Sequence, residues 1–370
     1  MSSADLTGGE RYLMDLITHS SPEFEHHPVL PYYGPFARLL TKLRIPFTVV
    51  SLESKIEITY LTAVIRLIRR RHVHILHTHG YRATFYGRLA SFLVPVKVVT
   101  TVHVSLLDYC DTPGLIRAAY VAAERMLSFR TDRFLCVSQA MQRDLTTLGI
   151  DLSRIARVSN GVDLSRFKPR PRSGKLLKEI GIEGKRPIIG TVGRLVNEKG
   201  HPFLFEALKQ LRVHYPELVC LVIGDGPLRA EYIEKVSVIG VADVCVFTGS
   251  KSDIEQYYAL MDLFVLPSIR EPFGLVLIEA MATGVPVVAT RSGGPREIIH
   301  DGYNGRLSAP GDPEDLFRTM EYMLQNPALA GEMAVHGADT VRKKFSIQKT
   351  VSDIERSYRS VSPTAKYRPS

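Results

Sequence analysis

Two carboxylates stand out in the apolar segment EPFGLVLIEAMATGVPVVAT, Glu271 at its start and Glu279 within it. The proline and glycine of PFG interrupt the chain, so a helix should begin near Gly274, just after Phe273, with free backbone N–H groups that favour a phosphate. Glu279 then lies roughly 7 to 8 Å further along the helix. That offset matches the step from a nucleotide's β-phosphate to its ribose, whose neighbouring hydroxyls suit one carboxylate. Glu271 would then face the group that the diphosphate carries.

Two cations and three glycines follow other apolar runs. Arg194 and Lys199 come after RPIIGTVG, beside Gly193 and Gly200, and Gly226 follows LVCLVIGDG. Arginine forks onto phosphate oxygens, lysine adds a compact charge, and glycine permits close approach of the backbone. These residues predict an anion site, although a solvated pair of cations near a turn also explains Arg194 and Lys199 taken alone.

Short β-branched runs alternate with helix-like periods, which predicts β-α units on buried parallel sheets. The polar residues above follow such runs directly, at the edge where open α/β sheets bind ligands. The 370 residues exceed one comfortable core, and 45% hydrophobic with 23% charged residues is typical of a globular protein. We expect an α/β protein of two Rossmann-like doubly wound domains facing a cleft, over 1–165 and 166–345. A C-terminal helix and tail over 346–370 would follow, and a return of this helix to the first domain is one arrangement.

The first domain has no sequence for its opening strand. LTGGERYLMDLI supplies a glycine-rich turn and a helix, but almost nothing apolar precedes it. Either the chain lacks that strand or Met1 lies downstream of the natural start.

Taken together, the motifs resemble the retaining glycosyltransferases of family 4, also called group 1, which have the GT-B fold. EPFGLVLIEAMATGVPVVAT looks like their E-x7-E signature. Further fragments occur in the family's order: GGERYLMDL, HTHG, TVH, VSQAM, SNGVD, GRLVNEKG, GDGPLR, FTG, DLFVLPS, SGGPREII and DGYNG. The resemblance covers nearly the whole chain and is specific as a set, although each fragment alone is weak.

The resemblance implies how a nucleotide-sugar donor is held. Arg194 and Lys199 would bind its diphosphate, together with backbone N–H groups of Gly274 and Leu275. Glu279 would accept hydrogen bonds from the ribose hydroxyls. Gly193, Gly226 and Phe273 are further predicted donor-binding positions because each follows an apolar run, at the edge of the sheet where ligands bind.

The resemblance also implies which residues meet the transferred sugar. Glu271 would bind its hydroxyls, and His103 of TVH would lie beside it. Gly8 and Gly9 fall on the loop that meets diphosphate and acceptor. The loop around Gly224–Pro227 is a candidate for contact with the base.

The implied reaction moves a sugar from a nucleoside diphosphate to an acceptor hydroxyl with retention of anomeric configuration. Charge on the departing β-phosphate would be stabilised electrostatically, with Glu271, His103, Arg194 and Lys199 as catalytic residues. The sequence contains no D-x-D motif, so neither a divalent metal nor another cofactor is expected. The expected setting is the synthesis of a cell-surface glycan, lipopolysaccharide or glycolipid, and the expected acceptor is a glycan, a lipid-linked molecule or a small molecule. The alternatives are a non-catalytic or truncated relative that binds nucleotide or membrane, and a sugar-nucleotide epimerase or phosphorylase of the same fold.

The net charge of +9 sits mainly in residues 1–160, which hold 19 Lys and Arg against 13 Asp and Glu. The excess points to an acidic partner such as phospholipid or anionic glycan, or merely to solubility; no nucleic-acid motif accompanies it. ITYLTAVIRLIRRRHVH predicts a helix that either lies on anionic lipid or packs on the sheet. Its apolar stripe is Leu61, Val64, Ile65 and Ile68, and its cations are Arg66, Arg69, Arg70 and Arg71. No signal peptide or spanning segment is evident, so we expect a cytoplasmic protein with peripheral contact at the inner face of the membrane.

Cysteine and histidine spacings offer little chemistry. The cysteines are far apart, which predicts buried reduced thiols at Cys110, Cys136, Cys220 and Cys245. HVHILHTHG gathers His72, His74, His77 and His79, but no carboxylate accompanies them in a metal-like pattern. A strand-end position at the cleft is the better interpretation for His79.

Overall fold

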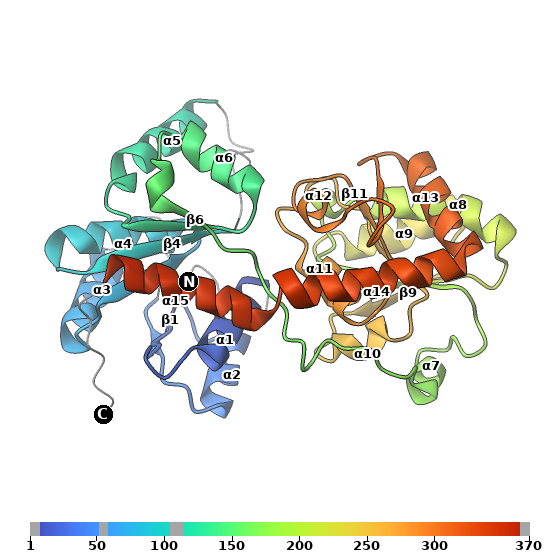
Figure 1. The fold of residues 1–370 in the computed structure, drawn as a ribbon, viewed down its shortest axis with the longest axis horizontal. Helices are drawn as coiled ribbons and strands as arrows, with labels where there is room; N and C mark the ends of the chain where they lie inside the picture. The colour runs from blue at the N-terminus through green and yellow to red at the C-terminus, as the bar shows by residue number, and fades with distance from the viewer. Residues whose placement is uncertain (1–7, 52–57, 104–113, 363–370) are drawn as a thin grey trace. The chain divides into compact units, whose positions relative to one another are not determined.

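The computed structural model describes residues 8–51, 58–103 and 114–362. The chain forms two compact units (Figure 1). Unit 1 comprises Met1–Asn160 and Ile347–Ser370, and unit 2 comprises Gly161–Ser346. Unit 1 has two parallel sheets and unit 2 has one, and each unit has its own hydrophobic core.

Unit 1 alternates helices and strands. Its elements are α1 (Gly8–His19), β1 (Val29–Leu30), α2 (Pro35–Lys42), β2 (Thr48–Val49), α3 (Ile58–Arg70), β3 (Ile75–His79), α4 (Tyr81–Leu93), β4 (Lys97–Val102), α5 (Gly114–Ser128), β5 (Arg133–Cys136), α6 (Gln139–Thr147), the 3-10 helix η1 (Leu152–Arg154), β6 (Ile155–Arg157) and α15 (Ile347–Val361). The strands β3, β4, β5 and β6 pair in that order, all parallel. This is the doubly wound pattern that the sequence predicts.

The strands of unit 1 form two separate sheets in the described ranges. β1 pairs with β2 alone, and β3 is the edge of the four-stranded sheet. A hollow of about 1150 Å³ is lined by residues of β1, β2 and β3 together with α1. The expectation of an absent first strand concerns the chain before α1, and residues 1–7 lie outside the described residues.

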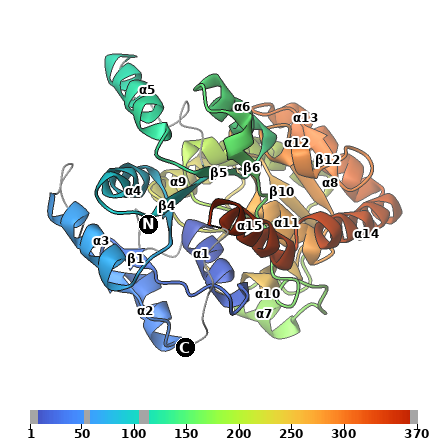
Figure 2. The same cartoon turned by 60° about the vertical axis from the view of Figure 1, so that its left-hand side comes forward.

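The last helix belongs to unit 1. α15 lies against α1 in both views (Figures 1 and 2). Its buried residues Ile347, Val351, Ile354 and Tyr358 share a core with α1 and α2. The C-terminal helix thus returns to the first domain, which is one of the arrangements expected from the sequence.

Unit 2 repeats the β-α pattern around a six-stranded sheet. Its elements are α7 (Gly174–Glu179), β7 (Ile188–Val192), the 3-10 helix η2 (Asn197–Lys199), α8 (His201–His214), β8 (Val219–Ile223), α9 (Arg229–Ile239), β9 (Cys245–Gly249), α10 (Ile254–Tyr258), β10 (Leu263–Leu266), α11 (Leu275–Ala282), β11 (Val287–Thr290), α12 (Pro295–Ile298), β12 (Arg306–Ser308), α13 (Pro313–Gln325) and α14 (Pro327–Lys344). The strand order is β12-β11-β10-β7-β8-β9, all parallel. Side chains of α8, α9 and α13 form one core with β7, β8 and β10.

The apolar stripe of α3 packs inside unit 1. Val64 and Ile68 are buried in a cluster with Tyr86 of α4, and Leu61 and Ile65 pack against the same cluster. The stripe therefore contacts other residues of unit 1. The two predicted alternatives for this helix were that it lies on lipid or packs on the sheet, and the structure shows packing within the fold. No helix in the described ranges is long and apolar enough to cross a bilayer.

The cysteines that the structure describes are free thiols. Cys136 and Cys220 are buried, and Cys245 is half-buried. The prediction of buried reduced thiols is confirmed for Cys136 and Cys220. Cys245 is a free thiol but is not fully buried, and Cys110 lies outside the described residues.

Candidate functional site

The site in unit 2 forms where the strand order of its sheet reverses. After β7 the chain adds β8 and β9 on one side, then returns to place β10 on the other side of β7. Loops that leave neighbouring strands in opposite directions open a crevice at their carboxyl ends, where α/β proteins bind ligands. The loop after β7 holds Arg194 and Lys199, and the loop after β10 holds Glu271.

An ion pair joins these two loops. Lys199 Nζ lies 2.7 Å from Glu271 Oε2, and Ser268 Oγ donates to the same oxygen at 3.1 Å. The backbone N–H groups of Ile269 and Arg270 donate to the carbonyl of Glu198. Glu271 is only 7% exposed, and the positive charge of Lys199 offsets the cost of burying this carboxylate. Oε1 of Glu271 accepts no hydrogen bond among those recorded for the described residues, so it is available to a ligand.

Glycines allow the site loops to approach one another. A Cβ on Gly200 would lie 2.1 Å from Pro267 O, and one on Gly226 would lie 2.5 Å from Leu195 O. A Cβ on Gly293 would lie 2.3 Å from the carbonyl oxygen of Glu271. Only glycine fits at these contacts, because real Cβ atoms do not approach oxygen so closely. Gly193 is not restricted in this way, since the atoms nearest to its added Cβ are 3.9 Å away.

The helix α11 begins beside Glu271, as the sequence predicts. Gly274 precedes it with φ of +102°, in the left-handed region that favours glycine. The backbone N–H groups of Gly274, Leu275 and Val276 precede the first hydrogen bonds of the helix, which run from Leu277 and Ile278 to the carbonyl of Gly274. The helix dipole and these N–H groups together favour an anion at this end.

Glu279 and Phe273 lie inside unit 2. Glu279 is 5% exposed, and Oε2 accepts a hydrogen bond from the hydroxyl of Tyr258 at 2.8 Å. Phe273 is buried edge-to-face against Phe345, at a distance of 5.9 Å between ring centroids. Its ring therefore packs in the core, which leaves only its backbone for a ligand. Arg194, by contrast, is exposed and its side chain has no recorded partner in the described part of the chain.

The histidines predicted in unit 1 meet at the carboxyl ends of β3 and β4. His79 Nδ1 lies 3.2 Å from His103 Nε2, and Tyr12 of α1 contacts both rings edge-on. Burial lowers the pKa of His103 to about 4. Burial, followed by the charges of His77 and His103, lowers the pKa of His79 well below its usual value. Both imidazoles are therefore neutral near pH 7 and can exchange a hydrogen bond with each other or with a substrate.

The other predicted positions in unit 1 carry less chemistry. Gly8 and Gly9 open α1, and a Cβ on Gly9 would meet no atom within 4 Å. His77 hydrogen-bonds Tyr358 through Nδ1 and Thr101 through Nε2. Within the described ranges no group of three or more His, Cys, Asp or Glu could hold a metal ion.

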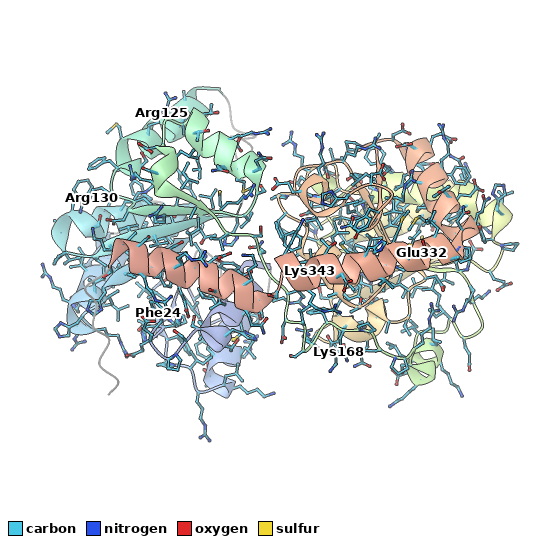
Figure 3. All side chains as sticks on the ribbon, in the orientation of Figure 1. Phe24, Arg125, Arg130, Lys168, Glu332 and Lys343 are labelled. Carbon is cyan, nitrogen blue, oxygen red and sulfur yellow. The ribbon has the colours of Figure 1, made fainter. Side chains whose placement is uncertain are left out.

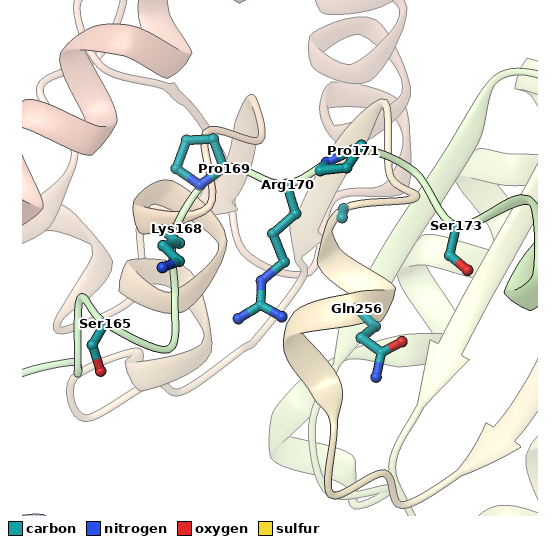
Figure 4. A pocket seen from close by; sticks show the side chains of 8 residues that line it. Ser165, Lys168, Pro169, Arg170, Pro171, Ser173 and Gln256 are labelled. Carbon is teal, nitrogen blue, oxygen red and sulfur yellow. The ribbon is translucent and has the colours of Figure 1, made fainter.

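A separate hollow in unit 2 contains none of the predicted donor residues. It has a volume of about 590 Å³ and lies between the segment Ser165–Ser173 and α10 (Figure 4). Lys168 and Arg170 line it. The guanidinium of Arg170 donates a hydrogen bond to the carbonyl oxygen of Arg166, and its Nη1 lies 4.0 Å from Glu255 Oε1. We assign the candidate site to the loops after β7 and β10 because their charged groups converge there.

Comparison with known proteins decides the family. Residues 6–166 match the model described as Glycosyltransferase Family 4, and residues 173–339 match that of Glycosyl transferases group 1. The 2-deoxystreptamine glucosyltransferase of Streptomyces kanamyceticus is 31% identical over 305 residues, which is 75% of this chain and 78% of that protein. The chain belongs to the group 1, family 4 glycosyltransferases.

Two further proteins are similar to this glycosyltransferase, one in sequence and one in structure. The lipopolysaccharide core biosynthesis glycosyltransferase LpsE of Rhizobium meliloti is 30% identical over 223 residues, 60% of this chain and 63% of that protein. The crystal structure of HepE from Anabaena in complex with UDP-glucose has a TM-score of 0.86 at 24% identity, covering 98% of both chains. The prediction of a GT-B fold with two Rossmann-like domains is confirmed.

Sequence reasoning missed the residues that hold the two carboxylates in place. Ser268 lies two residues after the end of β10, where its position in DLFVLPS was a usable signal. Tyr258 had no local signal, because its partner Glu279 is 21 residues further along the chain. The glycines of SGGPREII had no predicted role, although Gly293 contacts the loop of Glu271.

Proposed function

We propose that this glycosyltransferase transfers a sugar from a nucleoside diphosphate to an acceptor hydroxyl with retention of anomeric configuration. The observation that carries the proposal is the Lys199–Glu271 pair at the strand reversal of unit 2, beside the first turn of α11. A diphosphate needs fixed positive charge, and a sugar needs a carboxylate close to it. Both are present within one pair of loops.

Unit 2, over about the predicted residues 166–345, is proposed to bind the donor. Lys199, exposed Arg194 and the amides of Gly274 and Leu275 would hold the diphosphate. Lys199 keeps two N–H donors after pairing with Glu271. Glu279, fixed by Tyr258, would accept from the ribose, and the loops of Gly193 and Gly226 would pass close to the nucleotide.

The transfer step is proposed to need no covalent intermediate. The bond from the anomeric carbon to the β-phosphate oxygen breaks while the acceptor oxygen bonds to the same face. The departing phosphate takes the acceptor proton, and Lys199, Arg194 and the helix terminus stabilise the charge that builds on it. Glu271 Oε1 would hold the sugar hydroxyls. His103, neutral because burial lowers its pKa, would hydrogen-bond the sugar without adding charge.

Unit 1, which holds Gly8, Gly9 and His103, is proposed to present the acceptor. LpsE is a glycosyltransferase of lipopolysaccharide core biosynthesis, which supports a cell-surface glycan or lipid-linked acceptor. We propose a cytoplasmic enzyme with peripheral membrane contact, working without a divalent metal. HepE was crystallised with UDP-glucose, so uridine is the first base to test.

One observation favours a second candidate, a nucleotide-binding relative without turnover. The strands of unit 1 form two sheets with a hollow of about 1150 Å³ between them, and His103 stands in this unit. Donor binding through unit 2 without sugar release would be its signature.

The test is a panel of UDP-, GDP- and ADP-sugars, read by thermal unfolding and by release of the nucleoside diphosphate. We expect one donor series to stabilise the protein and to be slowly consumed. Arg194→Ala should weaken donor binding about tenfold, since a hydrogen bond to a charged group contributes about 1.5–3 kcal/mol. Arg318→Ala, which removes an exposed arginine of α13 paired with Glu314, is the matched control. Equal effects of both variants would contradict the assignment of Arg194.

A further inference from the structure

Three histidines lie on one face of the four-stranded sheet of unit 1. His77 and His79 are alternate residues of β3, and His79 pairs in register with Thr101 of β4. His103 follows β4 directly and lies two residues after Thr101. Alternate residues of a strand point to the same side of its sheet, so the three imidazoles share one side with the hydroxyl of Thr101.

Two buried tyrosines cover the histidines. Tyr12 of α1 meets the rings of His79 and His103 edge-on, with centroids 5.6 and 5.0 Å away. Tyr358 of α15 is in ring contact with Phe24, which is labelled beside that helix in Figure 3. His79 is only 6% exposed under this cover. Its ring nitrogens therefore need hydrogen-bond partners from the protein rather than from bulk water.

The three histidines differ in how many of their nitrogens are bonded. His77 uses both, because Nδ1 lies 2.6 Å from the hydroxyl of Tyr358 and Nε2 lies 2.7 Å from that of Thr101. Nδ1 of His79 lies 3.2 Å from Nε2 of His103, but Nε2 of His79 is buried without a partner among the described residues. His103 is half-buried, and its Nδ1 makes no recorded hydrogen bond within the described ranges. The protein thus holds one nitrogen of His103 and leaves the other for a ligand.

The contact between His79 and His103 admits two arrangements of protons. Burial lowers the pKa of both side chains, so each neutral ring has one N–H donor and one acceptor nitrogen. In the first arrangement His79 Nδ1 donates, which leaves its buried Nε2 as an acceptor without a donor and places the proton of His103 on Nδ1. In the second, His103 Nε2 donates, and the buried Nε2 of His79 then carries an N–H without an acceptor.

Two considerations favour the first arrangement. Buried N–H groups without an acceptor are rarer in folded proteins than buried acceptors without a donor. The carboxylate of Glu271, which is proposed to hold the same sugar, can only accept hydrogen bonds, so a donor to the sugar oxygens must come from another side chain. A proton on Nδ1 makes His103 that donor.

We propose that His79 is a positioning residue for the transfer reaction. Its Nδ1–H holds Nε2 of His103, so the proton of His103 stays on Nδ1 and is donated in a hydrogen bond to an oxygen of the transferred sugar. The hydrogen bond made by one ring nitrogen sets the tautomer that the other presents, and it also fixes the orientation of the ring. His79 acts only through His103, and no proton is transferred. The inference rests on the proposed contact of His103 with the sugar.

Nuclear magnetic resonance of the full chain with isotope-labelled histidine tests the tautomers without donor or acceptor. Couplings between ring nitrogens and carbon-bound protons show which nitrogen carries the proton, and the spectra of His79→Phe and His103→Gln assign the two rings. We expect the proton on Nδ1 of both rings in the original chain. His79→Phe keeps an aromatic ring against Tyr12 but removes the donor, so His103 should then populate both tautomers. A proton on Nε2 of His103 in the original chain, or an unchanged tautomer in His79→Phe, overturns the proposal.

Turnover of the nucleotide sugar tests the consequence for the reaction. His79→Phe should lower kcat/KM about fivefold, the effect of one hydrogen bond between neutral groups. Binding of the nucleoside diphosphate alone should not change, because its proposed contacts lie in unit 2. His79→Asn places a side-chain amide near the position of Nδ1 and should recover most of the lost turnover. A purely structural role of His79 would not give this combination, and a loss of diphosphate binding equal to the loss of kcat/KM would contradict the proposal.

The matched control is His27→Phe, also in unit 1. His27 Nε2 lies 2.8 Å from the hydroxyl of Thr48, and its Nδ1 is buried without a partner in the described part of the chain. The change should leave both the tautomer of His103 and turnover as they are, while thermal unfolding shows that each variant is folded. Equal losses of turnover in His27→Phe and His79→Phe overturn the proposal. Absence of turnover in the original chain would refute the proposed function instead, whereas the tautomers still decide whether His79 fixes the ring of His103.

Discussion

Replacing Lys199 by methionine keeps most of the length of the side chain but removes the charge that faces Glu271. The lost contact joins Nζ and Oε2 at 2.7 Å, between a carboxylate that is 7% exposed and a lysine that is 24% exposed. A hydrogen bond to a charged group contributes about 1.5–3 kcal/mol. Because Lys199 is partly solvated and Ser268 still donates to the same oxygen, we expect the free energy of unfolding to fall by about 2 kcal/mol. For a unit of this size, the midpoint of thermal unfolding should fall by about 4–8 °C.

A second substitution separates the structural role of Lys199 from its proposed role in donor binding. Glu271→Gln removes the charge that the lysine neutralises. In that background Lys199→Met should therefore cost less than about 0.5 kcal/mol of stability. Donor binding should behave differently, because the phosphate contact does not require Glu271. Lys199→Met should weaken binding of the nucleoside diphosphate about tenfold in both backgrounds.

The assay measures urea unfolding and calorimetric titration with UDP, GDP and ADP for the four proteins of this cycle. Stability losses that simply add would refute the ion pair as a coupled contact. A nucleotide affinity that does not change when the lysine is removed would refute its role at the phosphate.

Three further predictions concern the surroundings of the site. Tyr258→Phe removes the donor to Glu279 at 2.8 Å and should lower the free energy of unfolding by about 1–3 kcal/mol; unchanged stability in urea would contradict this. Gly200→Ala should destabilise the protein more than Gly240→Ala. Both glycines have positive φ, but only the first would place a Cβ against backbone oxygen; equal losses would show that the contact is relaxed. Burial lowers the pKa of His103 to about 4. Between about pH 4 and pH 6.5 this side chain is therefore neutral in the folded state and protonated in the unfolded state. Its contribution to stability should therefore fall by about 1.4 kcal/mol per pH unit from about pH 6.5 to 4. The free energy of unfolding in urea is measured as a function of pH. His103→Gln should make it depend less on pH, and an unchanged slope would refute the burial of His103 as the cause.

The parts of the fold that were predictable depend on local pattern. Apolar runs placed β7, β8 and β10, and the PFG break placed the start of α11, because strand burial and helix termination leave signals within a few residues. The short strands β1 and β12 carry two and three residues. No apolar run in the sequence marked either of them, whereas β2 and β6, which are as short, lie in the runs PFTVVSL and RIARVSN.

The parts of the site that were not predictable depend on contacts between distant residues. The sequence placed Lys199 at the diphosphate and Glu271 at the group that the diphosphate carries, but did not indicate that the two side chains pair directly across 72 positions. Phe273 was predicted to lie at the donor because it follows β10, whereas its ring is buried against Phe345. Neither contact has a trace in local sequence, because folding of unit 2 brings those segments together.

The measurement that tests the central claim most directly follows turnover of the identified nucleotide sugar by nuclear magnetic resonance, with a membrane extract as the source of acceptor. The account predicts release of nucleoside diphosphate together with a new glycosidic bond that keeps the donor's anomeric configuration, both lost in Glu271→Gln. Inversion at the anomeric carbon, or undiminished turnover by Glu271→Gln, would contradict it.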